Sequence, residues 1–422
     1  MTLLSQRDKK HLWHPLTQHK LHPEHLAIVK AKGCVLTDEN GHEYIDGIAS
    51  WYTCMYGHCN KYITNRVSNQ MQQLDQIVFA GFTHEPAIKL SEELIKILPK
   101  NQEKIFFSDN GSTSVDVAIK MAFQYHFNNG KRRGKIIAFE DGFHGDTFGA
   151  MSVSGLSVYN GPFEEFFIDV ERIPVPTEEN FDTVKQEFTK LIETQNVAAF
   201  IYEPLVQGAA AMKMYEGNLL DELLEIASRN NVLSIADEVM TGFGKTGRNF
   251  ASEYLTNQPD IICLAKSLTG GLLPMALTTC TQKVYDAFLS DDITKTFFHG
   301  HTYSANPLAC TAALAGIELL QSKEIQDNIQ RIIKSHQAFD KKINNHSKVK
   351  NTRQLGIIYA LDLNVEMARY GDLRYKLFNF FMKNGICLRP LGNTIYILAP
   401  FVITDEQLQK VYSTIEEALE IV

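Results

Sequence analysis

The sequence predicts an α/β fold in which a large, mostly parallel sheet carries a second, smaller α+β domain. Two observations support the large sheet. Short apolar runs typical of buried strands recur at 104–107, 135–139, 197–202, 232–236 and 261–265. Between some of these runs, at 113–127 and at 219–229, apolar residues recur with the spacing of a helix. Because parallel strands need crossover connections, this alternation indicates a sheet covered by helices on both faces.

The two ends of the chain follow a different pattern. Residues 27–44 alternate like a β-hairpin around Asn40-Gly41, a dipeptide typical of tight hairpin turns. A long helix is predicted from 305 to 322, followed by alternating runs at 357–361 and 394–398. We expect both ends to form one smaller α+β domain, with the chain divided into 1–50 (small domain), 51–305 (large cofactor-binding domain) and 306–422 (small domain).

Composition excludes several classes of function. The 422 residues carry 41 Lys plus Arg against 49 Asp plus Glu, a net charge of −8, so no field favours nucleic acid or an anionic membrane. The longest small and apolar stretch, 307–317, falls short of the roughly 20 residues that span a bilayer. The amino terminus has no apolar signal region, and the seven cysteines have no Cys-x-x-Cys spacing. We expect a cytoplasmic protein with reduced, mostly buried cysteines.

Chemically distinctive residues follow the predicted strands. Gly111-Ser112 comes after the first strand, where small residues let backbone N–H groups surround a phosphate. Asp237 follows the fourth strand and Lys266 follows the fifth. On its own, Lys266 could be a snorkelling side chain or an ion-pair partner of Asp237. Together, an amine for a Schiff base, a carboxylate for a pyridine nitrogen and a phosphate cup indicate pyridoxal 5′-phosphate.

Several motifs then resemble those of a known family. The segments 235–247 and 264–271, with Phe143-His144-Gly145 and Glu203-Pro204 in the same order, are similar to class-III, fold-type I aminotransferases. Further motifs at 11–15, 50–52, 57–58, 299–302, 306–310 and 389–390 resemble the branch of this family that aminates 8-amino-7-oxononanoate in biotin biosynthesis. The resemblance covers nearly the whole chain. It implies an aminotransferase that makes 7,8-diaminononanoate.

The resemblance also implies a role for each matching residue. It implies a homodimer with shared active sites, small-molecule substrates and Lys266 and Asp237 as catalytic residues. The implied cofactor ligands are Gly111, Ser112, Phe143, Asp237, Lys266 and Thr302, the last serving the other subunit. The implied substrate residues are Trp51, Tyr52, Gly300 and Arg389, with the arginine binding a carboxylate.

Three departures from the family pattern bear on the amino donor. Leu16 and Phe143 stand where the family usually has tyrosine, and His301 stands where proline is common. S-adenosylmethionine is the donor that the resemblance implies, and lysine is the alternative. Another class-III ω-amino acid aminotransferase is a second alternative, although residues 48–56 supply aromatics and no arginine for a second carboxylate. An alternative from another class is a cofactor-binding regulator that has lost turnover. Such a protein would lack some of the catalytic residues, whereas Lys266, Asp237 and the phosphate cup are all present here.

Other patterns give weaker signals. Gly244-Lys245-Thr246 resembles part of a P-loop, but Val239 replaces the glycine that the motif requires five residues earlier. His144 could be a general acid or could orient its loop through hydrogen bonds. The amino-terminal histidines have irregular intervals and no acidic or thiol residues interleaved in a metal-ligand pattern, so we expect solvated surface and no metal. These histidines are His11, His14, His19, His22 and His25.

Overall fold

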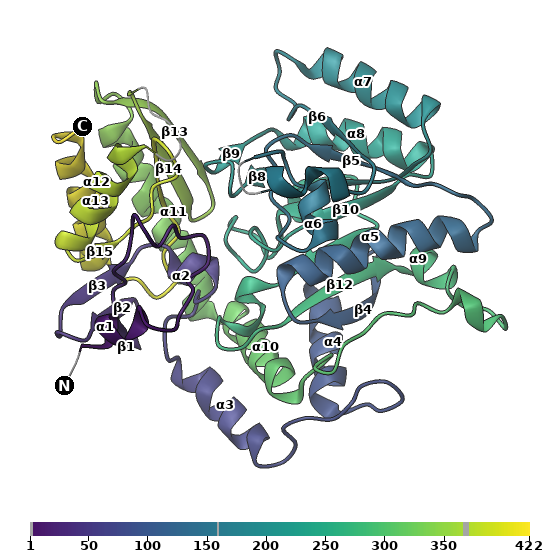
Figure 1. The fold of residues 1–422 in the computed structure, drawn as a ribbon, viewed down its shortest axis with the longest axis horizontal. Helices are drawn as coiled ribbons and strands as arrows, with labels where there is room; N and C mark the ends of the chain where they lie inside the picture. Colours follow the sequence, from purple (N-terminus) through teal and green to yellow (C-terminus); the bar gives the residue numbers. More distant parts are fainter. Residues whose placement is uncertain (1–2, 158–159, 366–370) are drawn as a thin grey trace.

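A seven-stranded sheet forms the centre of the larger part of the molecule. The structure, a computed structural model, describes residues 3–157, 160–365 and 371–422. The strand order is β4-β12-β11-β10-β7-β5-β6 (Figure 1), and only β12 runs against its neighbours. The strands are β4 (Gln102–Ser108), β5 (Lys135–Phe139), β6 (Val170–Ile173), β7 (Val197–Tyr202), β10 (Leu233–Asp237), β11 (Ile261–Leu264) and β12 (Ala276–Thr281). The α/β prediction and all five predicted strands are confirmed, whereas the sequence analysis missed β6 and β12.

Helices cover both faces of this sheet because its strands are apolar on both sides. Ile136 and Ala138 of β5 belong to the cluster that includes α5 (Gly111–Asn128), whereas Ile137 and Phe139 belong to the cluster on the opposite face. That second cluster includes buried residues of α7 (Phe181–Thr194) and α8 (Gly217–Arg229). The continuous apolar runs therefore reflect a two-sided burial, as expected for parallel strands.

The two ends of the chain share a sheet. It has the order β1-β2-β3-β15, in which β15 runs parallel to β3 and Ile386 lies opposite Ile45. Figure 1 shows these purple and yellow segments side by side. The strands are β1 (Ile28–Lys32), β2 (Val35–Asp38), β3 (Glu43–Asp46) and β15 (Ile386–Cys387). The predicted hairpin at Asn40-Gly41 joins β2 to β3. The domain boundaries at 50/51 and 305/306 stay a prediction.

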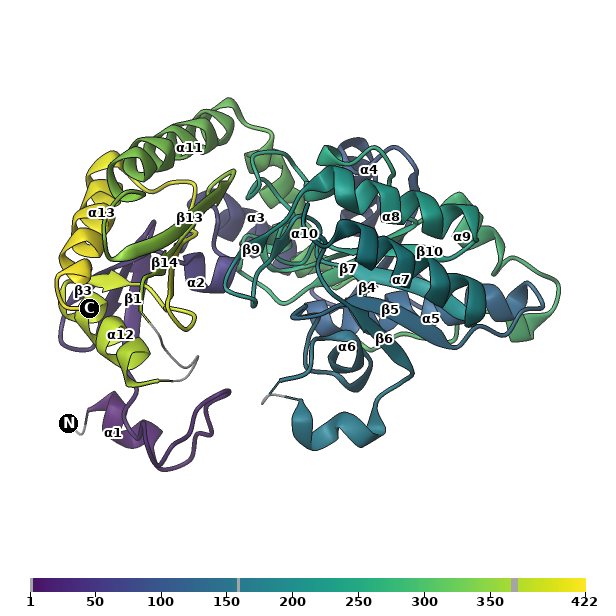
Figure 2. The same ribbon diagram turned by 90° about the horizontal axis from the view of Figure 1, so that it is seen from above.

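A second, antiparallel sheet completes the smaller part of the molecule. It consists of β13 (Val349–Leu355), β14 (Ile358–Leu363) and β16 (Thr394–Ile397), and Figure 2 shows helices surrounding it. These helices are α11 (Lys323–Ile343), α12 (Asp372–Lys383) and α13 (Asp405–Leu419). The helix predicted at 305–322 is α10 (Pro307–Leu320), which begins after Asn306, whose side chain accepts hydrogen bonds from the backbone of Leu308 and Ala309. That capping sets the start of the helix.

The remaining elements are short or peripheral. They are α1 (Leu4–Asp8), α2 (Ala49–Tyr52), α3 (Lys61–Met71), α4 (Glu85–Ile97), α6 (Phe148–Val153), α9 (Gln282–Asp286), β8 (Val206–Gln207) and β9 (Lys213–Met214), with 3₁₀ turns at Gly161–Phe166, Ala251–Tyr254, Lys266–Thr269 and Ile293–Lys295. In the described part of the chain, none of the helices combines the length and the apolar character that crossing a bilayer requires. All seven cysteines lie in described segments as free thiols, and four of them are buried.

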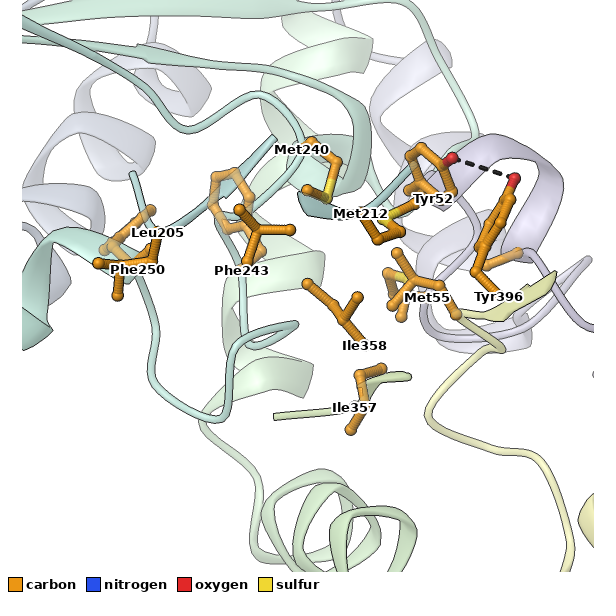
Figure 3. Close-up of a cluster of buried hydrophobic side chains, with 14 of the residues drawn as sticks. Tyr52, Met55, Leu205, Met212, Met240, Phe243, Phe250, Ile357, Ile358 and Tyr396 are labelled. Atoms are coloured by element: carbon orange, nitrogen blue, oxygen red, sulfur yellow. Dashed lines mark hydrogen bonds between the residues drawn. The ribbon is translucent and has the colours of Figure 1, made fainter. Parts of the chain in front are cut away.

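One continuous core joins the two parts of the molecule. Figure 3 shows Met240 and Phe243, from the loop after β10, close to Ile358 of β14 and to Met55. All four side chains are almost completely buried and belong to one cluster. Because this core is shared, the segments that carry the candidate site residues are held in fixed positions relative to one another.

Candidate active site

Candidate residues meet at the carboxyl edge of the large sheet. Gly111 follows β4, Phe143 follows β5, Glu203 follows β7, Asp237 ends β10 and Lys266 follows β11. These five strands run in the same direction, so the residues after them meet at one edge. Four of these residues, namely Gly111, Phe143, Asp237 and Lys266, were assigned to the cofactor or to catalysis from the sequence.

Lys266 places an uncommitted amine at this edge. Its side chain is half-buried, and among the described residues its Nζ atom has no hydrogen-bond or ion-pair partner. The direct ion pair with Asp237 that was one alternative is therefore not formed. The Nζ atom lies 5.2 Å from the centroid of the Tyr52 ring. Loss of water on burial lowers the pKa of this amine, which favours the neutral, nucleophilic form.

Asp237 is fixed by two hydrogen bonds. Its Oδ2 atom lies 2.7 Å from Nδ1 of His144, and its Oδ1 accepts from the backbone N–H of Val239 at 3.0 Å. Both Asp237 and His144 are buried. The structure therefore gives His144 a positioning contact with the carboxylate, a role that differs from both alternatives, the general acid and the orientation of its own loop. The sequence showed this histidine after a strand but gave no signal for its partner, 93 residues away.

Glu203 is a second buried carboxylate, to which the sequence analysis gave no role. Its two oxygens accept hydrogen bonds from the backbone N–H groups of Phe143, at 3.0 Å, and Gly208, at 2.9 Å. Burial raises the pKa of Glu203 to about 7. The side chain thus fixes the backbone of Phe143, whose ring is 39% exposed and free to contact a ligand.

The predicted phosphate cup has the geometry of an anion site. The Asn110 side chain caps α5 by accepting from the Thr113 backbone at 3.1 Å. Within the described segments, the backbone N–H groups of Gly111 and Ser112 have no hydrogen-bond partner. They lie at the start of an 18-residue helix, whose dipole attracts negative charge.

Two glycines allow close packing around this cup. A Cβ atom on Gly111 would lie 2.9 Å from Cγ1 of Val239, and one on Gly145 would lie 2.0 Å from Oγ of Ser112. The same Ser112 hydroxyl accepts from the Asp146 backbone at 2.9 Å. The helix start therefore packs directly against the loops that carry Asp237 and His144.

The predicted substrate residues gather on the other side of Lys266. Trp51 and Tyr52 lie in α2, and the Arg389 guanidinium lies 5.1 Å from the Trp51 ring. The Tyr52 hydroxyl donates to the Tyr396 hydroxyl at 3.1 Å, as Figure 3 shows. Sequence reasoning missed Tyr396, because nothing in the sequence pairs two tyrosines 344 positions apart.

The structure does not bring Gly300 and Thr302 into this group. Both are exposed, and the carbonyl of Thr302 accepts a hydrogen bond from Gln76 at 2.7 Å. No interaction among the described residues joins Thr302 to Gly111 or Ser112. Its role in a partner subunit stays a prediction. Lys245 of the P-loop-like segment is fully buried and donates to the Gly242 carbonyl at 2.6 Å, so it reaches no nucleotide.

The donor set matches the three polar parts of pyridoxal 5′-phosphate. Lys266 offers an amine without a partner for the aldehyde, Asp237 offers a fixed carboxylate for the pyridine nitrogen, and the N–H groups of Gly111 and Ser112 are free for phosphate. The three groups come from the ends of β4, β10 and β11 in one sheet, where β12 lies between β4 and β11.

Comparison with known proteins identifies the family. The family model described as Aminotransferase class-III matches residues 16–419. The chain is 42% identical over 419 residues to the adenosylmethionine-8-amino-7-oxononanoate aminotransferase of Synechococcus elongatus, covering 97% of this chain and 98% of that protein. It is 33% identical to the enzyme of the same name from Staphylococcus aureus, covering 99% of this chain and 97% of that protein.

Solved structures agree with this assignment. The chain superimposes on an adenosylmethionine-8-amino-7-oxononanoate aminotransferase from Methanocaldococcus jannaschii with a TM-score of 0.93, at 32% identity and 99% coverage of both chains. An amine transaminase from an uncultivated Pseudomonas species, solved with bound pyridoxal 5′-phosphate, gives a TM-score of 0.92 at 26% identity, covering 97% of this chain and 98% of that chain. The chain therefore belongs to the class-III aminotransferases, which depend on pyridoxal 5′-phosphate.

Proposed function

We propose that this aminotransferase converts 8-amino-7-oxononanoate to 7,8-diaminononanoate in biotin biosynthesis, with S-adenosylmethionine as the amino donor. The observation that carries the proposal is the similarity, over at least 97% of the chain, to curated enzymes that share one substrate name. The arrangement of Arg389, Trp51 and Tyr52 beside Lys266 supports it, because the acceptor has an apolar chain between a carboxylate and a keto group.

The residues around the cofactor have separate tasks in this proposal. When bound, the cofactor supplies a ring that accepts the electron pair released at the donor carbon. Lys266 would hold the cofactor through its carbonyl, and its amine, when free, would move a proton between the donor Cα and the cofactor C4′ carbon. Asp237 keeps a proton on the pyridine nitrogen, and His144 holds Asp237 in place. The N–H groups of Gly111 and Ser112 bind the phosphate, and the Phe143 ring stacks on the cofactor.

The substrate side positions the keto group. We assign Trp51 and Tyr52 to the walls of the pocket and Arg389 to the acceptor carboxylate, which a guanidinium binds through two parallel hydrogen bonds. Gly300 lines the pocket in this assignment. Both substrates use the same site in turn, because the donor leaves its amino group on the cofactor before the acceptor enters.

A homodimer with shared active sites is part of the proposal. Large apolar side chains are exposed on segments near Thr302, namely Val78, Phe82, Phe298 and Tyr303. Large apolar side chains exposed on neighbouring segments are typical of a protein interface, and the partner subunit's Thr302 would complete the phosphate site. We also place the enzyme in the cytoplasm, which the free thiols of all seven cysteines support.

Half-reactions with each donor test the proposal. Purified holoenzyme is mixed with S-adenosylmethionine or with lysine, and the cofactor absorbance reports amino-group transfer. We expect conversion by S-adenosylmethionine, followed by product formation when 8-amino-7-oxononanoate is added. Lysine is the second candidate, because Phe143 lacks the hydroxyl of the usual tyrosine. Conversion by lysine alone would overturn the donor assignment.

The acceptor is tested separately. Loaded enzyme is offered 8-amino-7-oxononanoate and, in parallel, the keto or aldehyde partners of ω-amino acids. We expect 8-amino-7-oxononanoate to react with the higher kcat/KM. Preferential reaction with an ω-amino acid partner would instead identify another class-III ω-amino acid aminotransferase.

A further inference from the structure

The amino-terminal segment carries a cluster of metal-ligand side chains to which the proposed reaction gives no role. Asp8 ends α1, and all five predicted surface histidines follow it in the next 17 positions along an irregular loop. The ligand atoms of Asp8, His14 and His25 all lie within 4.8 Å of one another. No other group of three such side chains meets this criterion in the segments 3–157, 160–365 and 371–422.

Four of the five histidines that were expected on the solvated surface are only partly exposed. That expectation rested on the lack of an interleaved acidic residue, but Asp8, which precedes the histidines, lies 2.8 Å from Nε2 of His14. His14, His19, His22 and His25 are each half-buried, and only His11 is exposed. The fold therefore brings the carboxylate of Asp8, rather than that of the neighbouring Glu24, beside the histidines.

His25 has a ring nitrogen without a hydrogen-bond partner, and its ring lies against that of His14. Its Nε2 atom is buried and has no hydrogen bond, and its ring centroid lies 3.7 Å from that of His14. A buried ring nitrogen without a partner is unfavourable unless a ligand occupies it. His22 also has an unpartnered Nε2, but its ring stacks on Tyr375 and stands outside the cluster.

Neighbouring contacts hold the three ligands together. Lys9 and Glu24, the residues next to Asp8 and His25, form an ion pair at 3.0 Å that closes the loop. The His14 backbone N–H donates to Nε2 of His19 at 2.9 Å, which holds a further imidazole beside the cluster.

We propose that Asp8, His14 and His25 bind one Zn²⁺ ion per chain. Two imidazoles and a carboxylate are ligands that Zn²⁺ accepts, with a remaining position open to water. The ion would replace the proton between His14 and Asp8 and occupy the free nitrogen of His25. Its role is structural: it cross-links the beginning and end of the 8–25 segment, which has no regular secondary structure after Asp8.

Zinc binding by the intact holoenzyme tests the proposal. Protein without an affinity tag is dialysed against buffered Zn²⁺ and its metal content is measured, for the wild type and for Asp8→Asn, His14→Gln and His25→Gln. We expect one Zn²⁺ per chain in the wild type and about 100-fold weaker binding in each variant, because each loses a direct ligand. The matched control is His42→Gln, since His42 contacts Asp38 at 3.1 Å without a third ligand. Equal binding by all variants, or no binding by the wild type, would overturn the proposal.

Two further measurements distinguish metal binding at this site from metal binding by thiol or imidazole groups elsewhere in the protein. Co²⁺ bound at this site should give visible d–d bands without a thiolate charge-transfer band, whereas binding at the exposed Cys59 would give that band and contradict the proposal. Zn²⁺ should also slow tryptic cleavage after the exposed Lys10 and Lys20 in the wild type but not in His25→Gln. Neither readout depends on turnover, so the outcome is independent of the proposed reaction.

Discussion

The cofactor side and the substrate side of the candidate site are built in different ways. On the cofactor side, Gly111, Asp237 and Lys266 each lie within three residues of the end of a buried strand of one sheet. On the substrate side, Trp51 and Tyr52 belong to a separate turn, and Arg389 comes from the other end of the chain. One sheet edge therefore positions the chemistry, whereas contacts between remote segments position the pocket wall.

The turn on the substrate side is strained. All four residues of α2 have positive φ, from 47° at Ala49 to 71° at Tyr52, so the turn is left-handed. Such a conformation costs roughly 1–2 kcal/mol per residue. The Ser267 hydroxyl holds the turn by donating to the Tyr52 carbonyl at 2.8 Å. Since Ser267 follows Lys266, this bond also links the two sides of the site.

Replacing Lys266 with alanine should have the largest effect. Loss of the amine removes both the attachment point and the proton carrier, so we expect kcat to fall by at least about 10⁴-fold. Steady-state assays with 8-amino-7-oxononanoate measure this, with circular dichroism as the control for folding. Turnover within tenfold of the wild type would show that the amine is dispensable.

Asp237→Asn should have the next largest effect. An amide cannot stabilise a proton on the pyridine nitrogen, and we expect kcat to fall by about 10²–10³-fold with a smaller change in KM. His144→Phe is the companion variant, since it leaves the carboxylate but removes the 2.7 Å contact. A greater loss in His144→Phe than in Asp237→Asn would place the main role on the histidine.

Arg389→Leu should affect the acceptor and leave the cofactor bound. Losing a charge-assisted contact of about 1.5–3 kcal/mol predicts a rise of roughly 10- to 100-fold in KM for 8-amino-7-oxononanoate. The half-reaction with the donor and the absorbance of the holoenzyme report the cofactor side. If this variant lost its cofactor, the separation between the two sides would be wrong.

Tyr396→Phe should have the smallest effect. It leaves the buried Tyr52 hydroxyl without an acceptor, at a cost of about 1–3 kcal/mol in the free energy of unfolding. Denaturant unfolding measures this loss. The double variant Tyr52→Phe with Tyr396→Phe should recover part of it, because no hydroxyl is then left unpaired. If the double variant lost as much stability as the two single variants added together, a direct interaction between the two hydroxyl groups would be contradicted.

The sequence predicted the strands whose burial is two-sided. The apolar runs that correspond to β5, β7, β10 and β11 contain few polar residues. They could therefore be predicted as strands without an alternating pattern of apolar and polar residues. The missed β6 is an edge strand with the sequence Val-Glu-Arg-Ile, and the missed β12 contains three threonines among its six residues. Such polar strands are defined by their neighbours in the sheet rather than by their own composition.

The predictability of the site follows the same division. Asp237 and Lys266 could be predicted because strand ends of a parallel sheet share one edge. The left-handed turn at Trp51 and the partnership of Tyr52 with Tyr396 could not, because both depend on contacts between residues distant in sequence. Asp8 beside His14 was missed for a related reason: the contact arises from the path of an irregular loop.

The most direct test of the account is chemical identification of the residue that holds the cofactor. Holoenzyme is reduced with borohydride, digested and analysed by mass spectrometry. The account predicts that the pyridoxyl mass is found on the peptide containing Lys266 and nowhere else. A label on Lys245, which lies fully buried nearby in the sequence, or no label on any lysine, would contradict it.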